Sequence, residues 1–523
     1  MIDEWKEGGN SENHESVVTR QFLTECPINA HHLGIFAGKN TRQFAVGDML
    51  NYVASSSNNP HTQQSEEKKL KWSTLGLLSG MKEVKRLICN YEFASSTTTS
   101  SYKQIFVADL GSDAYSFYGF SMLDSKFLYA KEESFLETTS HLAQIKSYVS
   151  HLINHHILIH SYDMEFVVHG LVGFILNRYV ESVYGIHDRN YRLQKMHDAV
   201  VHLDSSGYAL PLYSQAYSVP MERFSLQFVT YMKYKSPILF QMIENIIGQG
   251  FMDGFIRNIL DEFKFQQHEC YKSDEHAIQQ QRQMYTYMTK QSMNIHDFVR
   301  LLRSHSTHLP AHALSENVFA QRWIFGVGLL YLRGAVDVET TTRTTHLILQ
   351  QVGYRGGIIS EDYTYEDKIH FMVLESDKTQ TEFVKNVERR MVTHPLPFQA
   401  KIVKKGPGGK RKRFSETNGV GGDEVIRQNN VGEGKKDENG YDDHTSALSM
   451  TRMTASPIRF VSVDPFNFWI KCVHLVAPAE MFVEQLYTDY DTFGQIYALR
   501  QMSLLNMGTN NERYVAWIYM HGL

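Results

Sequence analysis

Histidines are concentrated in one part of the chain, where their spacing could support metal chemistry. The group consists of His151, His155, His156, His160 and His169. The pairs 151/155 and 156/160 have the i, i+4 spacing that places two imidazoles on one helix face, as metal ligands require. The two pairs would lie on different faces, and no HExxH motif supplies the general base that a metal-activated water needs. Two interpretations therefore stay open: a metal site, or polar and interfacial histidines in a His-rich protein.

Other patterns that carry enzymatic chemistry are missing from the sequence. No GxxxxGK[ST], strand-associated GxGxxG or GxSxG motif occurs, so neither a phosphate-binding loop nor a nucleophile elbow is indicated. The cysteines lie far apart and form no CxxC pair: Cys26, Cys89, Cys270 and Cys472. This spacing excludes a zinc ribbon and a disulfide scaffold, and it fits a reducing compartment.

One short segment is strongly basic and could contact phosphate groups. Its cations are Lys401, Lys404, Lys405, Lys410, Arg411, Lys412 and Arg413. The block opens a run, 404–451, with almost no large apolar residue, which predicts a disordered insertion assigned to 404–455. Ser55–Lys69 is also polar and is expected to be a solvated loop. The basic block is either a nuclear-import or phosphate-contacting patch or simply a solvated loop, and its composition favours neither.

The overall composition limits the class of protein. The chain has 523 residues, 42% hydrophobic and 21% charged, as in globular proteins of about three domains. Its net charge of −5 excludes a polycation that binds nucleic acid along its whole length. The best apolar run, Trp323–Leu332, is half the roughly 20 residues that a membrane span needs, and the acidic start is unlike a signal peptide. We expect a soluble, intracellular protein without membrane contact.

The elements that would position such side chains are helical through much of the chain. Helical spacing of apolar residues predicts a helix or broken helix pair over Phe135–His160 and another helix over Met164–Tyr184. Gly185 is a suitable residue to end the second helix. Ser236 and Pro237 form a favourable N-cap and first-turn pair and predict the start of a further helix.

After Arg333 the pattern changes to short runs rich in β-branched and aromatic residues. The runs are 345–352, 368–376, 397–404, 457–464 and 468–476. Their alternation and the turn residues between them predict an antiparallel β-sandwich, interrupted by the insertion at 404–455. From Ala479 the pattern is helical again, with Asp491 or Thr492 capping a helix to Leu505. The predicted fold class is therefore α+β and multidomain.

Several segments, in the same order along the chain, resemble one protein family. FVVHGLVGFILNRYVESVYGIHDRNYR (166–192) resembles the WLNEGFA helix of the gluzincin zinc aminopeptidases. CPINAHHLGIFAGK (26–39), SYKQIFVADL (101–110) and YKSPILFQMIEN (234–245) are similar to strands and a helix around their active site. The basic insertion followed by IRFVSVDPFNFWIKCV (458–473) more closely resembles non-catalytic relatives of these enzymes, the TBP-associated factors that form the second subunit of transcription factor TFIID.

The resemblance implies which residues stand at the zinc-binding positions of the enzymes. There, the two HExxH histidines and a glutamate of the WLNEG helix bind zinc, and the HExxH glutamate is the base. Alignment through Gly170 puts His169 at the third-ligand position, Lys146 and Ser150 at the histidine positions and Ser147 at the base position. A protonated lysine has no lone pair for a metal, and serine does not replace a catalytic carboxylate.

Two further groups of the enzymes are also missing in this comparison. The GAMEN exopeptidase loop corresponds to residues 119–123 (GFSML), which lack the glutamate that holds the substrate amine. The position of the oxyanion-stabilising tyrosine falls on Lys233, with Tyr231 and Tyr234 out of register. The resemblance therefore implies no catalysis, no metal, no cofactor and no small-molecule substrate.

The resemblance also implies a domain layout. Residues 1–80 are expected to be mostly flexible, with a remnant strand at 26–39, and 81–332 to form an inactive, thermolysin-like aminopeptidase domain. The β-sandwich would span 333–478 and a helical segment 479–523. Most of the family's N-terminal sandwich and C-terminal solenoid is missing, so we expect a fragment or a reduced subunit.

By the same resemblance, the chain would be a non-catalytic scaffold and promoter-recognition subunit of TFIID in RNA polymerase II transcription initiation, located in the nucleus. Its partners would be other TFIID subunits and core-promoter DNA near the initiator, where the basic block would contact phosphates without reading sequence. Two alternatives remain open. One is a divergent zinc metallo-aminopeptidase with misaligned ligands, supported by the histidine cluster, and the other is an adaptor that binds peptides in a degenerate peptidase cleft.

Overall fold

The computed structural model describes most of the chain in segments. These are residues 2–5, 20–23, 34–36, 41–46, 49–54, 60–89, 102–117, 119–157, 162–218, 225–262, 293–306, 316–339, 341–352, 354–355, 358–359, 368–386, 391–399 and 457–506. Within these segments, no helix combines the length and apolar character needed to cross a membrane. The basic block, the insertion at 404–455 and most of the strand expected at 26–39 lie outside them, and residues 34–36 are not in a strand.

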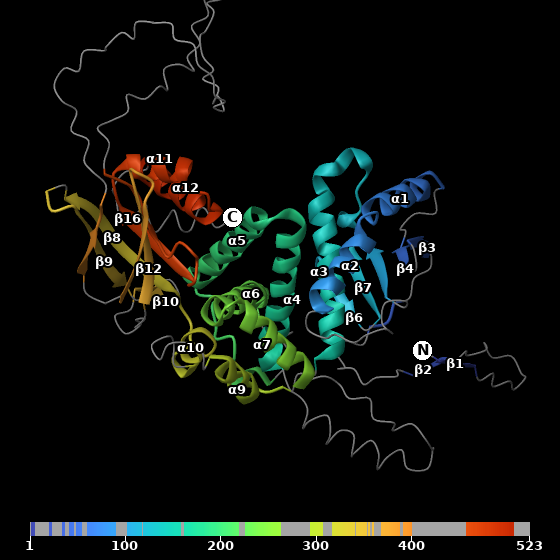
Figure 1. The fold of residues 1–523 in the computed structure, drawn as a ribbon. Coiled ribbons are helices and arrows are strands. Elements are labelled where there is room, and N and C mark those ends of the chain that lie inside the picture. Colours follow the sequence, from blue (N-terminus) through green and yellow to red (C-terminus); the bar gives the residue numbers. More distant parts are fainter. Residues whose placement is uncertain are drawn as a thin grey trace, which may run out of the picture.

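A mixed five-stranded sheet lies at one end of the molecule, with helices covering it (Figure 1). The strand order is β3 (Thr41–Val46), β4 (Met49–Ala54), β5 (Lys103–Val107), β7 (Phe120–Asp124) and β6 (Ala114–Phe117). β4, β5 and β7 are parallel, and both edge strands are antiparallel to their neighbours. Helices α1 (Pro60–Ser73) and α2 (Leu77–Cys89) connect β4 to β5.

The solvated loop expected at Ser55–Lys69 is a wrong prediction from residue 60 onward, where α1 begins. Pro60 suits the first helical position because it has no N–H to leave unpaired. The helix is mostly polar, and Leu70 near its end is fully buried in a small core with Phe106 and Leu123 of the sheet. Docking of one apolar residue thus stabilises a helix that has little apolar pattern of its own.

The centre of the molecule is a helical body. Its helices are α3 (Glu137–His156), α4 (Glu165–Tyr184), α5 (Ile186–Ser205), α6 (Leu226–Ile247), α7 (Gln249–Glu262), α9 (Ile295–Ser306) and α10 (Glu316–Trp323). The predicted helices at 135–160 and 164–184 are confirmed, and a 3-10 segment, Lys131–Leu136, precedes α3. Gly185 ends α4 with φ +94°, and its N–H donates to the Val180 and Glu181 carbonyls. This left-handed backbone favours glycine.

The predicted helix start at Ser236–Pro237 is wrong, because both residues lie inside α6. The actual N-cap is Ser225, whose hydroxyl accepts from the Phe228 N–H. Pro237 is tolerated in the interior because its ring packs directly against Gly173 of α4, where an added Cβ would lie 2.2 Å from the Pro237 Cγ. Tertiary packing between two helices therefore overrides the local signal for a helix start.

The β-sandwich consists of a four-stranded and a three-stranded sheet. The first contains β14 (Val392–Pro397), β9 (Thr344–Val352), β8 (Leu330–Glu339) and β16 (Lys471–Val476), and the second β13 (Gln380–Asn386), β12 (Lys368–Glu375) and β15 (Ile458–Val463). Apolar side chains of both sheets belong to one core, and the rings of Phe371 and His394 stack at 6.3 Å across them. Short two-stranded sheets pair β1 (Ile2–Trp5) with β2 (Arg20–Leu23), and β10 (Tyr354–Arg355) with β11 (Ile358–Ile359).

Two predictions about this sandwich need correction. The strand expected at 397–404 is wrong where the structure describes it: β14 ends at Pro397 and residues 398–399 lie outside any strand, while residues 400–404 are outside the described part of the chain. β14 is an edge strand, where prolines are tolerated because one side of the strand needs no partner. The sandwich is also not wholly antiparallel, since β16 runs parallel to β8.

A short crossover, residues 464–470, joins β15 to β16. The carboxylate of Asp464 accepts hydrogen bonds from the backbone N–H groups of Phe468 and Trp469, and it pairs with the Lys471 ammonium at 2.7 Å. Asp464 and Asn467 both have positive φ. Asp464 therefore fixes the conformation of the segment in which the chain passes from one sheet to the other.

The C-terminal helices α11 (Ala479–Thr488) and α12 (Thr492–Asn506) pack beside the sandwich and reach α5 (Figure 1). The predicted helix from Asp491 or Thr492 is thereby confirmed. Asn190 of α5 donates to the Asp491 carboxylate at 3.0 Å, and Arg500 of α12 pairs with Asp198. These contacts tie the last helix to the helical body.

Candidate functional site

The residues at the enzyme-like positions lie on three helices, and the structure brings several of them together. Lys146, Ser147 and Ser150 are on α3, His169 is on α4 and Lys233 is on α6. The charges of Lys146 and Lys233 both act on His169, and that of Lys233 acts on Lys146. Lys146 therefore shares one electrostatic environment with His169, 23 residues away in sequence (169 − 146), and with Lys233, 87 residues away (233 − 146). We call Lys146, Glu165, His169 and Lys233 the convergence site.

Close packing of α4 against α6 accounts for this arrangement. His169 precedes Gly173 by one helical turn on α4, and Lys233 precedes Pro237 by one turn on α6. Since Gly173 and Pro237 are in direct contact, the two preceding turns lie side by side. The ion pair between Arg178 and Glu244 holds the following turns of the same two helices.

Burial and cations keep the imidazole of His169 neutral. Burial, the largest cause, and the Lys233 and Lys146 ammonium groups together lower the pKa of His169 to about 3. The surrounding protein and Lys233 also lower the pKa of Lys146, while Asp113 opposes this effect. Part of the Lys146 side chain is solvent exposed, as is Lys233, so the site presents two accessible ammonium groups.

Glu165 is a member of this site that sequence reasoning missed. It lies one turn before His169 on the same face of α4, and the i, i+4 spacing was the available signal. Burial raises the pKa of Glu165 to about 7, and Lys233 opposes that shift. Its Oε2 atom is buried and has no hydrogen-bond partner among the described residues. The carboxyl group therefore titrates near neutral pH.

These residues do not fit the zinc ion that the resemblance to peptidases would imply. A protonated lysine offers no lone pair, and the charges of Lys146 and Lys233 would repel a divalent cation. Ser147, at the position of the base, is buried, and its hydroxyl donates to the Ala143 carbonyl at 3.0 Å. In the described parts of the chain, no three His, Cys, Asp or Glu side chains are grouped as metal ligands.

The segment compared with the exopeptidase loop, residues 119–123, forms the turn into β7 and most of that strand. Gly119 has φ +80° in the turn between β6 and β7. The hydroxyls of Ser116 and Ser121 lie 3.2 and 3.4 Å from the Ser147 carbonyl oxygen, so this hairpin packs on α3 beside the convergence site. The segment contains no carboxylate, and Asp113, before β6, is the carboxylate whose charge acts on Lys146.

The two tyrosines near Lys233 have different surroundings. Tyr231 is fully buried, and the ammonium group of the buried Lys235 lies 5.3 Å from its ring centroid. Burial lowers the pKa of Lys235 to about 8, and the charge of Asp204 raises it. Tyr234 is 37% exposed and points away from the core. Lys233, between them, is the residue whose charge reaches His169 and Glu165.

Of the histidine cluster at 151–160, the structure describes the side chain of His151. His151 is buried, its ring stacks on Tyr102 at 4.8 Å, and its Nδ1 lies 3.1 Å from the Phe117 carbonyl oxygen. It therefore contacts the sheet in the manner of an interfacial core histidine. His155 and His156 are in the last turn of α3, and His160 lies outside the described residues.

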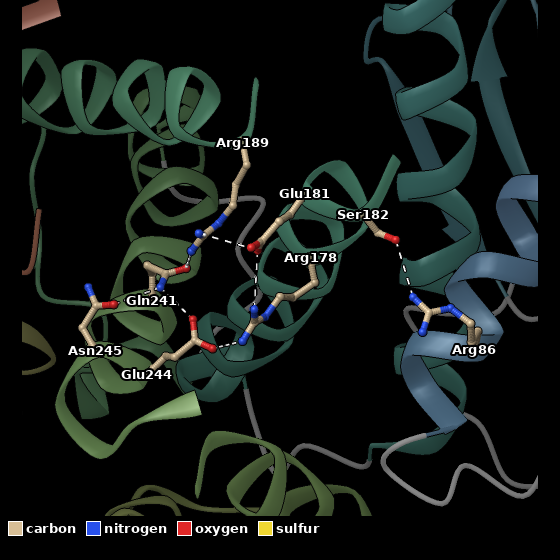
Figure 2. A network of polar contacts seen from close by, with 8 residues as sticks. All are labelled: Arg86, Arg178, Glu181, Ser182, Arg189, Gln241, Glu244 and Asn245. Carbon is tan, nitrogen blue, oxygen red and sulfur yellow. Dashed lines mark hydrogen bonds and ion pairs between the residues drawn. The ribbon is translucent and has the colours of Figure 1, made fainter. Parts of the chain in front are cut away.

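A buried ionic network stabilises the helices that carry the site (Figure 2). Arg178 pairs with Glu244 and, at 3.4 Å, with Glu181, while Arg189 pairs with Glu181 at 3.6 Å. Gln241 accepts from Arg189 and donates to Glu244 at 2.7 Å. Burial raises the pKa of Glu244, and Arg178 opposes this. The network joins α4, α5 and α6, so it fixes their relative positions.

A cavity of about 210 Å³ lies between α5, α12 and the β15–β16 crossover. Its charged groups are already paired: Lys471 with Asp464, and Arg500 with Asp198. Cys472 also lines it, but burial raises the pKa of this thiol to about 12, so it is not a ready nucleophile. The cavity is therefore a feature of the contact between helices and sandwich.

Neither a protein-family description nor a curated protein matches the chain by sequence. Its structure is similar to the crystal structure of Legionella pneumophila aminopeptidase A in complex with aspartic acid, with a TM-score of 0.51 and 10% sequence identity. The similarity covers 90% of this chain and 43% of that one, so the chain spans less than half the length of that enzyme. At this identity the likeness concerns the fold alone, and the chain therefore has a mixed α+β, aminopeptidase-like fold.

Proposed function

We propose that the chain is a non-catalytic protein that uses an aminopeptidase-like fold as a scaffold for other macromolecules. The observation that carries this proposal is the set of residues in the convergence site. Lys146 and Lys233 act with two positive charges on His169, the residue that the sequence resemblance aligns with a zinc ligand of the peptidases. Ser147 is engaged with its own helix backbone and lacks the carboxylate of a general base.

The partners that we propose are the other subunits of TFIID, with the chain acting as its second TBP-associated factor in the nucleus. Support comes from the collinear sequence resemblance, which includes the basic insertion before 458–473. Promoter DNA near the initiator would be a second partner, contacted through phosphates by the cations of the basic block. The likeness in fold to an aminopeptidase supports the scaffold part of this proposal and is silent on the partners.

Metal analysis of the purified full chain tests the first part. We expect no stoichiometric zinc and no hydrolysis of aminoacyl-p-nitroanilides at any zinc concentration. The variant Lys146→His/Ser150→His/His169→Glu serves as the matched control, because it restores a peptidase-like ligand set and should raise the zinc content. One tightly held zinc in the unaltered chain, lost on His169→Ala, would overturn the proposal in favour of a divergent metallo-aminopeptidase.

Co-purification tests the partners. A tagged chain expressed in its own cells and extracted from nuclei should bring down TBP and further TFIID subunits in similar amounts. The control is the same tag on the variant Arg178→Ala, whose helical body should be destabilised by the loss of a buried ion pair. Recovery of the chain from nuclei without TBP would contradict the assignment to TFIID and leave the scaffold role standing.

A further inference from the structure

The convergence site has charges that its own surroundings do not balance. The ammonium groups of Lys146 and Lys233 form no ion pair with a carboxylate of the described residues. Asp113, the carboxylate whose charge favours the charged form of Lys146, is itself bound to Lys126 at 2.6 Å. Glu165 is the other carboxyl group nearby, and its burial favours the neutral form. The site is therefore positively charged and accessible.

Such a cluster is suited to an anionic ligand. Two like charges held near each other by three packed helices repel, and a carboxylate between them would relieve that repulsion. The helices cannot separate easily, because the Gly173–Pro237 contact and the Arg178–Glu244 pair fix α4 against α6. The site is thus organised before any ligand arrives, which lowers the entropic cost of binding.

We propose that the convergence site binds the carboxylates of an acidic segment of a partner polypeptide, through Lys146 and Lys233. This inference rests on the proposed non-catalytic function, since a bound zinc ion would occupy the same place. A peptide fits better than a nucleic acid because the site holds two cations and lies near the carboxylate of Asp113. A continuous phosphate backbone would extend past these two cations and meet Asp113, whereas a single carboxylate side chain would not.

The role of Glu165 follows from its position near Lys233. When it is ionised, Glu165 is an internal competitor for the Lys233 ammonium, so the variant Glu165→Gln should bind an acidic peptide more tightly. The neutral imidazole of His169 leaves the positive charge to the two lysines. The variant His169→Gln should therefore change the affinity little.

The experiment uses fluorescein-labelled hexaglutamate and the full chain, with fluorescence anisotropy at low and moderate salt. We expect saturable binding that is weakened about tenfold or more by Lys146→Glu and by Lys233→Glu, as for close charge pairs at interfaces. The matched control is Lys82→Glu, the same charge change at an exposed position on α2, which should leave the affinity unchanged. Circular dichroism confirms folding, and Lys233→Gln replaces either variant that fails to fold.

Three outcomes would overturn the inference. One is the absence of binding by the unaltered chain, and another is an equal loss in Lys82→Glu, which would indicate a net-charge effect. The third is displacement of the peptide by single-stranded DNA at a lower concentration of negative charges (phosphate groups) than unlabelled hexaglutamate needs (carboxylate groups). That result would assign the site to nucleic acid. Each of these can occur while the chain holds no zinc and co-purifies with TBP, so failure here is distinguishable from failure of the proposed function. Inorganic phosphate serves as a further competitor, and displacement by it at far higher concentration than by hexaglutamate supports a peptide ligand.

Discussion

The contact between Gly173 and Pro237 gives a sharp test of how the site is held together. In the variant Gly173→Ala, the new Cβ would lie 2.2 Å from the Pro237 Cγ and 2.6 Å from its Cβ. Ordinary contact begins near 3.4 Å, so the helices must separate by about 1 Å, because the proline ring cannot rotate away. Overpacking of this kind costs about 1–3 kcal/mol.

A second effect acts in the opposite direction. Alanine is favoured over glycine inside a helix by about 1 kcal/mol, so the net destabilisation should be about 0–2 kcal/mol. The control is Gly254→Ala in α7, where the nearest atom to the new Cβ is 3.7 Å away. There the helix preference acts alone and should stabilise the chain by about 0.5–1 kcal/mol.

Urea unfolding followed by circular dichroism at 222 nm measures both changes. The double variant Gly173→Ala/Pro237→Ala should recover most of the loss, because the rigid ring that meets the new Cβ is gone. If Gly173→Ala stabilises the chain as much as Gly254→Ala does, the two helices do not approach as described. The reasoning that joins Lys233 to His169 through this contact would then be wrong.

Three further predictions concern charge. Folding raises the pKa of Glu165 from 4.5 to about 7, so its contribution to the free energy of unfolding is fully present below pH 4.5 and is lost as the pH rises to 7. In Glu165→Gln, the fall in the free energy of unfolding between pH 5 and pH 8 should therefore be smaller by about 1–3 kcal/mol, measured by urea unfolding. Arg178→Ala removes the ion pair of Glu244, which is 8% exposed, and should cost about 3–5 kcal/mol, whereas Arg86→Ala, at 62% exposure, should cost far less. Equal effects would contradict the burial of the network. Replacing the cations of 410–413 by alanine should reduce the slope of log DNA affinity against log salt by about 0.9 for each lost phosphate contact. The same change should shift a fluorescent fusion toward the cytoplasm. An unchanged slope would show that the block does not contact DNA.

Part of the fold could be predicted from the sequence because its cause is local. The helices at 137–156 and 165–184 and the strands β9, β12 and β15 follow from the spacing of apolar residues, which reports the buried face of each element. Gly185 ends α4 as expected, because a left-handed backbone is a property of the residue itself. The absence of a carboxylate at Ser147, which the resemblance aligns with the base, and of histidines at Lys146 and Ser150 is likewise read from residue types.

Other features depend on contacts between distant residues, and the tertiary structure alone determined them. Pro237 has the local signal of a helix start, but Gly173 provides space for its ring inside α6, and the parallel pairing of β16 with β8 joins strands that are far apart in the sequence. The i, i+4 spacing places Glu165 on the helix face of His169, but its pKa depends on burial, which raises it, and on Lys233, 68 positions away (233 − 165), which lowers it, and spacing reports neither. Residue type and spacing determine what each side chain can do. Packing determines which charged groups lie close together, as it does for Lys146, His169 and Lys233 on three different helices.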